Sequence, residues 1–582
     1  MNNTSSSITA AERKPVTQKS GLLWLRWGFR LLAAAMAGLH AWAAAVSHSM
    51  NPDGVNYLDI GDAYFRGDWG AAINTVWSPL YSWLTGSVLW LFKPEMRWEF
   101  PLIHALNFLI FLVALAAFEF MWEQVRPARG QTAEIGWPDW AWWSIGYLLF
   151  LWAALSLIQI WAVTPDMLMA ALLFLAAGLL ARIRAGQDGW RTFALLGFVL
   201  GLGYLSKSIM MPVSLVILAA SFVAIADKRR AWPRPGAAVL CFLLVAGPFI
   251  LLMSATKGYF TYGEAGRLTY ARHVNGVIYP HWQGIPAGDG VPTHPSRQIF
   301  AAPPIYEFAT PIGGTYPISH DQTYWYDGVV VRFDWGNQLR TLLASALYYA
   351  DLFLVQQTAV LFGAALLYLA GGRRWPGLFA LARGGLLTWV ALAALLLYAP
   401  ILVAGRYVGA FVILFWSDLL ANASLPRSPL AGRVVQSSAL LMAAFLFASI
   451  ILFNLQGFGD LTRGAASGAA VAGPPSWPGA TAEALAELGI EQGDPVAVIG
   501  YGFDSFWARL ARVQIVAEMM GWEADPFWLG DANLQAEVLA AFAATGAKAI
   551  VAEYAPPYAN LPGWRQVESS NFYIYLLPEE GA

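Results

Sequence analysis

The sequence predicts a polytopic α-helical membrane protein with about eleven transmembrane helices and a small α/β domain near its C-terminal end. Hydrophobic residues make up 58% of the 582 residues and charged residues only 12%, about half the charged share of soluble domains. Many apolar runs approach the roughly 20 residues that a helix needs to cross a bilayer. After about residue 480, short β-branched runs alternate with helical patterns, which is typical of an α/β domain with partly parallel strands.

Eleven apolar segments are predicted to span the membrane. They lie near residues 22–46, 99–122, 140–160, 165–183, 191–207, 209–226, 236–254, 344–370, 384–402, 405–421 and 435–455. The shorter apolar stretch Ser78–Phe92 is predicted to be an interfacial helix. Residues 1–20 are polar and are predicted to form a disordered cytoplasmic tail.

The basic residues of the short loops all fall on one side of this arrangement. They are Arg26, Arg30, Arg126, Arg129, Arg182, Arg184, Arg191, Lys228, Arg229, Arg230, Arg234, Arg373, Arg374, Arg383, Arg427 and Arg433. The positive-inside rule therefore predicts a cytoplasmic N-terminus. With eleven spans, the loops 47–98 and 255–343 and the C-terminal region face outward, which in the inner (plasma) membrane of a bacterium means the periplasm.

These assignments divide the chain into a transmembrane domain over residues 21–460, a linker over 461–480 and a soluble periplasmic α/β domain over 481–582. Gly500-Tyr501-Gly502 follows a predicted strand, and we interpret it as a tight strand-to-helix turn rather than a nucleotide site. The net charge of −2 gives no reason to expect a nucleic-acid partner. The single cysteine, Cys241, excludes an intramolecular disulfide, and the first apolar stretch does not read as a cleavable signal peptide.

Three acids occur within the loop that follows the first span. Asp53 lies between Pro52 and Gly54 on a turn that can point into a cavity, where a carboxylate can act as general base toward a hydroxyl. Asp59 and Asp62 are spaced to share one face of a helix and are predicted to support substrate binding, together with Tyr57. The alternative is that these acids solvate an outer loop or cap a helix.

Two further charged residues are expected at the same face of the membrane. Lys207 separates two apolar segments with almost no loop, and a cation there is costly unless it snorkels or finds a partner. We interpret Lys207 as a ligand for a lipid phosphate, with snorkelling to the headgroups as the alternative. Asp166 follows Thr164-Pro165, a pattern that also predicts a helix start with a capping hydroxyl, a proline at the first position and an acid favoured by the helix dipole.

Arg406 and Tyr407 begin a late span at the same predicted face. An arginine can hold phosphate oxygens in a bidentate manner, which suits a phosphate leaving group. The two residues are therefore predicted to bind the donor phosphate.

The long loop 255–343 is rich in Tyr, His, Pro and Gly and is predicted to be a functional lid. Its aromatic faces and polar edges suit carbohydrate, and Glu264, Arg272 and His273 are predicted to contact substrate. No tight spacing of metal ligands occurs among its His and Glu residues, so no metal site is assigned, and a divalent metal stays an open alternative.

In their order along the chain, these short motifs resemble the GT-C superfamily of integral-membrane glycosyltransferases. The resemblance is to the bacterial branch of the dolichyl-phosphate-mannose–protein mannosyltransferases, which includes the aminoarabinose transferases of lipid A. It covers about residues 22–421 and rests on five segments. They are Asn51–Gly54, Ser78–Tyr81, Thr164–Asp166, Gly203–Lys207 and Arg406–Tyr407.

The resemblance implies a polyprenyl-phosphate-linked sugar as donor, no cofactor, Asp53 as the base and Lys207 as a contact of the donor phosphate. It adds Tyr81 as a supporting residue. The adjacent Asp-Glu pair of the protein mannosyltransferases is absent, which favours a lipid, glycan or other cell-envelope acceptor over a protein. The α/β domain has no counterpart that can be aligned.

The predicted function is an inverting glycosyltransferase, and two other classes of protein are the alternatives. A transporter or flippase of lipid-linked sugars would place charges at mid-span or break helices in repeated halves. A scaffold that recruits partners would leave Lys207 and the acidic first loop unexplained. The clustering of polar residues at one face and the lack of a visible repeat favour the enzyme.

Overall fold

The structure is a computed structural model, and it describes most of the chain. The described residues are 15–126, 134–225, 233–277, 297–308, 313–325, 329–370, 385–423, 425–426, 428–466, 478–559, 561–568 and 570–578. Predictions that concern residues 1–14, Arg129, Lys228, Arg229, Arg230, His281, Trp282, His294, Asp327, Arg373, Arg374, Arg383 and Arg427 lie outside this part.

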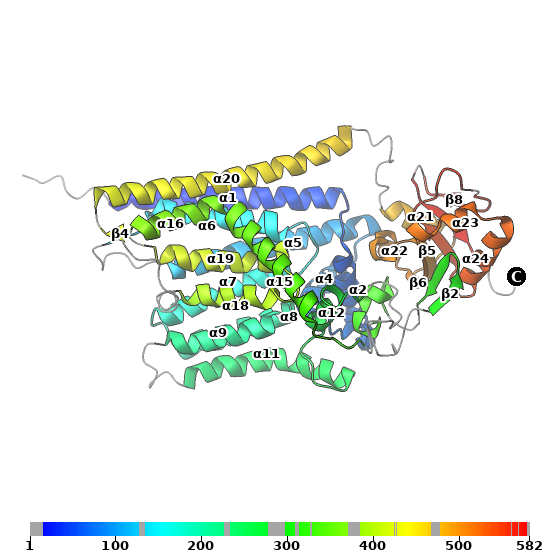
Figure 1. The fold of residues 1–582 in the computed structure, drawn as a ribbon, viewed down its shortest axis with the longest axis horizontal. Helices are drawn as coiled ribbons and strands as arrows, with labels where there is room; N and C mark the ends of the chain where they lie inside the picture. The colour runs from blue at the N-terminus through cyan, green and yellow to red at the C-terminus, as the bar shows by residue number, and fades with distance from the viewer. Residues whose placement is uncertain are drawn as a thin grey trace, which may run out of the picture.

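Long apolar helices lie side by side and form a bundle along the long axis of the molecule (Figure 1). The helices are α1 (Pro15–Val46), α5 (Met96–Val125), α6 (Asp139–Trp152), α7 (Asp166–Arg184), α8 (Trp190–Ser206), α9 (Met210–Ala224), α11 (Pro233–Lys257), α15 (Trp335–Ala350), α16 (Thr358–Ala370), α18 (Leu386–Tyr398), α19 (Gly405–Ala421) and α20 (Pro429–Ala466). The π-helical turns η1 (Ala153–Ile158) and η2 (Asp351–Val355) extend α6 and α15.

The prediction of a polytopic helical membrane protein is confirmed, since each predicted span coincides with a helix. Within the described residues, six helices are long and apolar enough to cross a membrane, or seven if α15 and α16, bent by 71° at their junction, count as one span. The predicted number of eleven is not reproduced by this test, because α8, α9, α18 and α19 are each shorter than 18 residues. Helix α1 begins at Pro15, inside the tail that the sequence predicted to be disordered.

The two ends of the bundle differ in charge. At the end remote from the α/β domain, near β4 (Leu425–Pro426), Arg126 pairs with Asp139, whereas Arg30 lies in the middle of α1 and binds Glu119 inside the bundle (Figure 1). Arg184 lies in the last turn of α7, which runs toward the same end. The described basic residues of the short loops thus share one end, as the sequence predicted, and the other end carries the first loop.

The first loop folds into a compact helical layer between the bundle and the α/β domain (Figure 1). It contains α2 (Pro52–Arg66), α3 (Trp69–Ala72) and α4 (Pro79–Phe92), so the stretch Ser78–Phe92 is helical as predicted, and its interfacial position stays a prediction. The later segment with α13 (Pro317–His320) and α14 (Gln322–Trp325) packs on this layer. The Asn56 side chain donates a hydrogen bond of 2.7 Å to Ser319 Oγ, and Asn74 donates one of 2.6 Å to the His320 carbonyl.

Helices α2 and α4 touch through their backbones at Gly61 and Gly86. A Cβ atom at Gly61 would lie 2.7 Å from the Ser82 carbonyl oxygen and 2.9 Å from the Gly86 nitrogen. Neither backbone atom can rotate away, so any larger residue must push α2 from α4.

Gly61→Ala should therefore lower the free energy of unfolding by about 1–3 kcal/mol, as in overpacked cores. The midpoint of thermal unfolding in detergent should fall with it. The matched control is Gly247→Ala in α11, where a Cβ atom would meet nothing within 4 Å. An unchanged midpoint for Gly61→Ala, measured beside this control, would contradict the close contact of α2 and α4.

The α/β domain is a seven-stranded sheet with helices on it, and it uses strands from two distant parts of the chain. Three central strands, β5 (Pro495–Gly500), β6 (Gln514–Met520) and β7 (Ala549–Ala552), are parallel, in the order β6-β5-β7. Strands β9 (Tyr573–Leu576) and β8 (Arg565–Gln566) continue the sheet antiparallel beyond β7. The helices are α21 (Pro478–Glu487), α22 (Phe506–Ala511), α23 (Asp525–Leu529) and α24 (Ala532–Ala543).

The long loop completes this sheet with a hairpin of β2 (Arg297–Ala301) and β3 (Pro304–Glu307). Strand β3 pairs antiparallel with β6, with Tyr306 opposite Glu518. The domain boundary predicted at residue 481 therefore divides strands of one sheet. The predicted linker 461–480 is also shorter than expected, because α20 continues to Ala466 and α21 begins at Pro478.

The Gly500–Gly502 segment forms the turn that the sequence predicted between β5 and the following helices. The buried Glu553 carboxylate accepts a hydrogen bond of 2.9 Å from the Tyr501 amide, and Glu518 accepts one of 2.6 Å from the Gly502 amide. A Cβ atom at Gly500 would collide with the Glu553 carboxylate. Burial raises the pKa of Glu553. The two acids thus hold the turn.

Candidate active site

Charged residues from the ends of four helices meet at the end of the bundle that faces the α/β domain. Asp53 lies in the first turn of α2, and Asp166 is the first residue of α7. Lys207 directly follows α8, and Arg406 lies in the first turn of α19, next to Tyr407. These five residues are called the charge cluster below. The sequence predicted all five as site residues, and the structure brings them together.

Two ion pairs and one aromatic ring connect the members of the charge cluster. Arg406 Nη2 donates to Asp53 Oδ2 at 2.7 Å, and the Lys207 ammonium donates to Asp166 Oδ1. Lys207 Nζ lies 4.0 Å from the centroid of the Tyr407 ring, within the range of a cation–π contact. Side-chain exposure is 24% for Asp53, 29% for Arg406 and 21% for Lys207, but 1% for Asp166. A ligand can therefore reach three of these groups, while Asp166 lies beneath them.

The start of α2 is fixed by its contacts with the segment before α7. Asn51 accepts a hydrogen bond of 2.7 Å from the Val163 amide through its side-chain oxygen. Pro52 occupies the start of α2, where its fixed φ favours a helix. A Cβ atom at Gly54 would lie 2.6 Å from Met50 Sδ and 2.8 Å from Val163 Cβ. Asp53 is thus held close to the Asp166 segment and benefits from the positive end of the α2 dipole.

The start of α7 differs in detail from the predicted cap. Pro165 is the N-cap residue, no side chain caps the helix, and Asp166 is its first residue. The Thr164 hydroxyl therefore does not have the capping role that the sequence suggested. The acid at the helix start is as predicted, and the same carboxylate also binds Lys207. Lys207 has this partner within the protein, which agrees with the site interpretation more than with snorkelling.

Tyr57 and Tyr81 lie behind the charge cluster and are buried. The Tyr57 ring packs edge-on against Trp77 and Tyr81, at centroid distances of 5.3 and 5.2 Å. The Tyr81 hydroxyl donates to Asn107 Oδ1 at 2.7 Å, and Tyr81 is 0% exposed. Burial raises the pKa of Tyr57 well above its usual value. These contacts make the two tyrosines supports of α2 and α4, and their predicted role in substrate binding stays a prediction.

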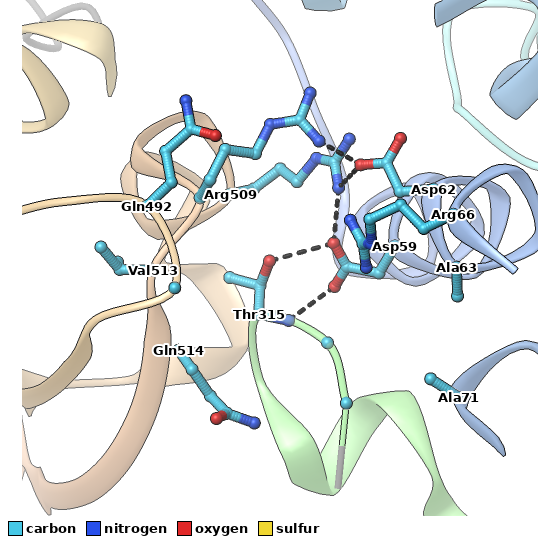
Figure 2. Close-up of a pocket in the computed structure, with 14 residues that line it drawn as sticks. Asp59, Asp62, Ala63, Arg66, Ala71, Thr315, Gln492, Arg509, Val513 and Gln514 are labelled. Atoms are coloured by element: carbon cyan, nitrogen blue, oxygen red, sulfur yellow. Dashed lines mark hydrogen bonds and ion pairs between the residues drawn. The ribbon is translucent and has the colours of Figure 1, made fainter. Parts of the chain in front are cut away.

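Asp59 and Asp62 lie on another face of α2 and bind the α/β domain (Figure 2). Arg509 Nη1 lies 2.7 Å from both Asp59 Oδ1 and Asp62 Oδ2. The Thr315 amide donates to Asp59 Oδ2 at 2.7 Å. Burial raises the pKa of Asp62, but the charges of Arg509 and Arg512 outweigh this effect and lower it below its usual value. The prediction that both acids support substrate binding is therefore corrected, because guanidinium and backbone groups of the protein occupy them.

A polar cavity of about 380 Å³ lies beside these acids, between α2 and the α/β domain (Figure 2). Arg66, Arg509 and Arg512 line it together with Asp59 and Asp62. Backbone segments around residues 313–315 and 492–493 close its other sides.

The three predicted site residues of the long loop also have protein partners or neighbours. Glu264 accepts hydrogen bonds from Arg267 Nε at 2.5 Å and from Thr261 Oγ1 at 2.8 Å, so it stabilises the start of α12 (Ala265–His273). Arg272 and His273 are exposed in the last turn of α12. Burial raises the pKa of Tyr501 in the α/β domain to about 12, and the charge of Arg272 acts against this rise.

The described residues contain no group of three or more His, Cys, Asp or Glu side chains that could hold a metal ion.

Residues that sequence reasoning missed are Glu99, Arg509 and Arg512. Glu99 occurs at an ordinary helix start, Arg509 lies in the short helix α22 and Arg512 directly follows it, so no local pattern marks these residues.

The fold and the site define the class: a multi-pass helical membrane protein with a charge cluster at one end of its bundle and an α/β domain on that end. No family model and no curated protein matches the chain. Among solved structures, the chain is similar to ArnT from Cupriavidus metallidurans in the apo state, with 13% identity, a TM-score of 0.49 and coverage of 94% of this chain and 97% of that chain. The same protein bound to undecaprenyl phosphate matches with 13% identity, a TM-score of 0.48 and coverage of 95% and 98%.

The chain is also similar to the Archaeoglobus fulgidus oligosaccharyltransferase tethered with an acceptor peptide. That match has 13% identity and a TM-score of 0.39, and it covers 90% of this chain and 69% of that chain.

Proposed function

We propose that the protein is an inverting glycosyltransferase that moves a sugar from a polyprenyl-phosphate donor to a hydroxyl of a lipid, glycan or other cell-envelope acceptor. One observation carries the proposal. Asp53, Asp166, Lys207 and Arg406, far apart in sequence, converge at the same end of the bundle with two cations and a carboxylate open to solvent. This transfer needs a base for the acceptor hydroxyl and cations for the donor phosphate, and the cluster contains a carboxylate beside two such cations.

In the proposed reaction, the Asp53 carboxylate takes the proton of the acceptor hydroxyl. The hydroxyl oxygen attacks the anomeric carbon, a new C–O bond forms, and the bond between that carbon and the phosphate oxygen breaks with inversion. The electron pair of the broken bond stays on the departing polyprenyl phosphate. Because a phosphate leaves without being protonated, one carboxylate suffices, in contrast to the paired acids of glycoside hydrolases.

Lys207 and Arg406 would bind the donor phosphate and stabilise its charge as the bond breaks. Arg406 Nη2 donates a hydrogen bond of 2.7 Å to Asp53 Oδ2. A phosphate that attracts the Arg406 guanidinium would compete with this pair and leave the Asp53 carboxylate available to the acceptor. Asp166, buried beneath Lys207, would keep the lysine in place during the exchange.

The proposed location is the bacterial inner membrane, with a cytoplasmic N-terminus and with the charge cluster and the α/β domain on the periplasmic side. The gathering of the described basic loop residues at the opposite end of the bundle supports this orientation. A polyprenyl chain would lie in the bilayer, and its phosphate would reach the cluster at the membrane surface.

Transport of lipid-linked sugars is the alternative. The 71° bend between α15 and α16 is the feature that favours it, because broken helices are common in transporters. The charge cluster favours the enzyme, since its members lie at helix ends and not at mid-span.

The test is mass spectrometry of lipid extracts from the source cells, with the gene deleted and with the wild-type gene restored. We expect a polyprenyl-phosphate sugar to accumulate in the deletion strain and to disappear on restoration, and its mass identifies the sugar class. If the deletion leaves the lipid-linked sugars unchanged, the proposed donor is wrong.

A further inference from the structure

A buried group of charges joins α2 to the α/β domain. It consists of Asp59 and Asp62 from α2, Glu99 from α5, Arg509 from α22 and Arg512 directly after α22, and it is called the docking cluster below. Arg509 Nε donates to Glu99 Oε1 at 2.8 Å, and Arg509 Nη1 lies 2.7 Å from each aspartate. Arg512 contacts Asp62 and Glu99 as well. One arginine thus bridges two membrane-side helices.

Burial makes the docking cluster sensitive to the loss of Arg509. The side chains of Arg509 and Glu99 are each 3% exposed, and that of Asp59 is 6% exposed. A buried carboxylate without a cation is strongly unfavourable, whereas the exposed pair of Arg565 and Glu487 contributes little. Without Arg509, three carboxylates would face one another with the partly exposed Arg512 and the cavity-lining Arg66 as the nearby cations.

The docking cluster and the charge cluster use different faces of the same short helix. With 3.6 residues per turn, Asp59 and Asp62 lie about 120° and 180° around the α2 axis from Asp53. Arg509 therefore binds one side of α2, while Asp53 projects from another side toward Arg406. Because α2 is a 15-residue helix in a loop layer, a shift at Asp59 moves Asp53 with it.

We propose that Arg509 is a positioning residue, through which the α/β domain fixes α2 so that Asp53 is aligned for its reaction. The inference rests on the proposed function, because it concerns the base of that reaction. It assigns the α/β domain a role in the chemistry at the membrane surface. A polar cavity of about 380 Å³ lies beside the cluster, so on this face of α2 the contact with the α/β domain is made by ion pairs and hydrogen bonds.

The test uses the full-length protein in detergent or nanodiscs with Arg509→Met, Arg509→Lys and the control Arg565→Gln. Transfer is measured with a polyprenyl-phosphate sugar donor, and amide hydrogen exchange is measured over residues 52–66. We expect Arg509→Met to lower kcat about 100-fold, as a small misplacement of a catalytic group does, with the KM for the donor nearly unchanged because Lys207 and Arg406 are intact. Exchange in α2 should become faster, Arg509→Lys should recover part of both effects, and Arg565→Gln should match wild type.

A folded Arg509→Met protein with wild-type kcat and wild-type exchange in α2 would overturn the proposal. A loss of kcat/KM that comes entirely from a higher KM, with kcat unchanged, would also overturn it, because this would indicate a donor contact rather than positioning. If Arg509→Met does not fold, Arg509→Lys decides, and wild-type kcat and exchange in that variant overturn the proposal. If wild-type protein transfers no sugar, the proposed function fails, whereas the exchange in α2 still reports whether Arg509 holds the helix.

Discussion

Asp53→Asn should abolish sugar transfer, with a loss in kcat of at least about 100-fold, the lower range for removal of a general base. The asparagine keeps the size of the side chain and can still accept a hydrogen bond from Arg406, which now binds Asp53 at 2.7 Å. Donor binding should therefore persist. In cells, the lipid-linked sugar should accumulate in an Asp53→Asn strain as it does in the deletion strain.

The same substitution at Asp68 is a matched control. Asp68 lies in the same loop, is exposed, and caps α3 through a hydrogen bond from the Ala71 amide, a role that asparagine also fills. Asp68→Asn should transfer sugar like wild type. If Asp53→Asn also clears the lipid-linked sugar at the wild-type rate, Asp53 is not the base, and transport becomes the better interpretation.

Lys207→Met should have the second-largest effect, a fall in kcat/KM of about 100- to 1,000-fold, the cost of removing one group that stabilises developing charge. The methionine fills similar space but cannot bind phosphate. It also leaves the buried Asp166 carboxylate without its partner, so part of the loss can come from a disturbed site.

The double variant Lys207→Met with Asp166→Asn separates these two causes, since it removes the unpaired buried charge. Its thermal midpoint should recover toward the wild-type value while its kcat/KM stays low. Lys548→Met, which removes a lysine paired with Asp494 in the α/β domain, should leave transfer unchanged. Recovery of transfer in the double variant would show that Lys207 serves only to neutralise Asp166.

The short motifs near helix ends were readable from the sequence because each is a local pattern. A polar residue next to a long apolar run, such as Lys207 or Arg406, has to lie at a membrane surface whatever the rest of the chain does. The alternation of spans and basic loops then assigns Asp53, Asp166, Lys207 and Arg406 to one end. Their meeting in one cluster was therefore predictable, although their pairing was not.

The roles of Asp59 and Asp62 were beyond such reasoning. Their spacing correctly predicts that they share a helix face, but the sequence contains nothing that says what lies opposite that face. Their partner Arg509 is 450 positions away from Asp59. In the structure, Asp59 and Asp62 bind Arg509 and hold the α/β domain against α2.

The sequence by itself determined the membrane class, the helices, the sidedness of the charges and the α/β character of the C-terminal region, because hydropathy, periodicity and loop charge are local properties. Only the tertiary structure decided that a hairpin from the long loop completes the C-terminal sheet and that Arg509 ties this domain to α2. Strand pairing and buried ion pairs depend on which segments the tertiary packing brings together. The sequence around one partner contains no pattern that indicates the other partner.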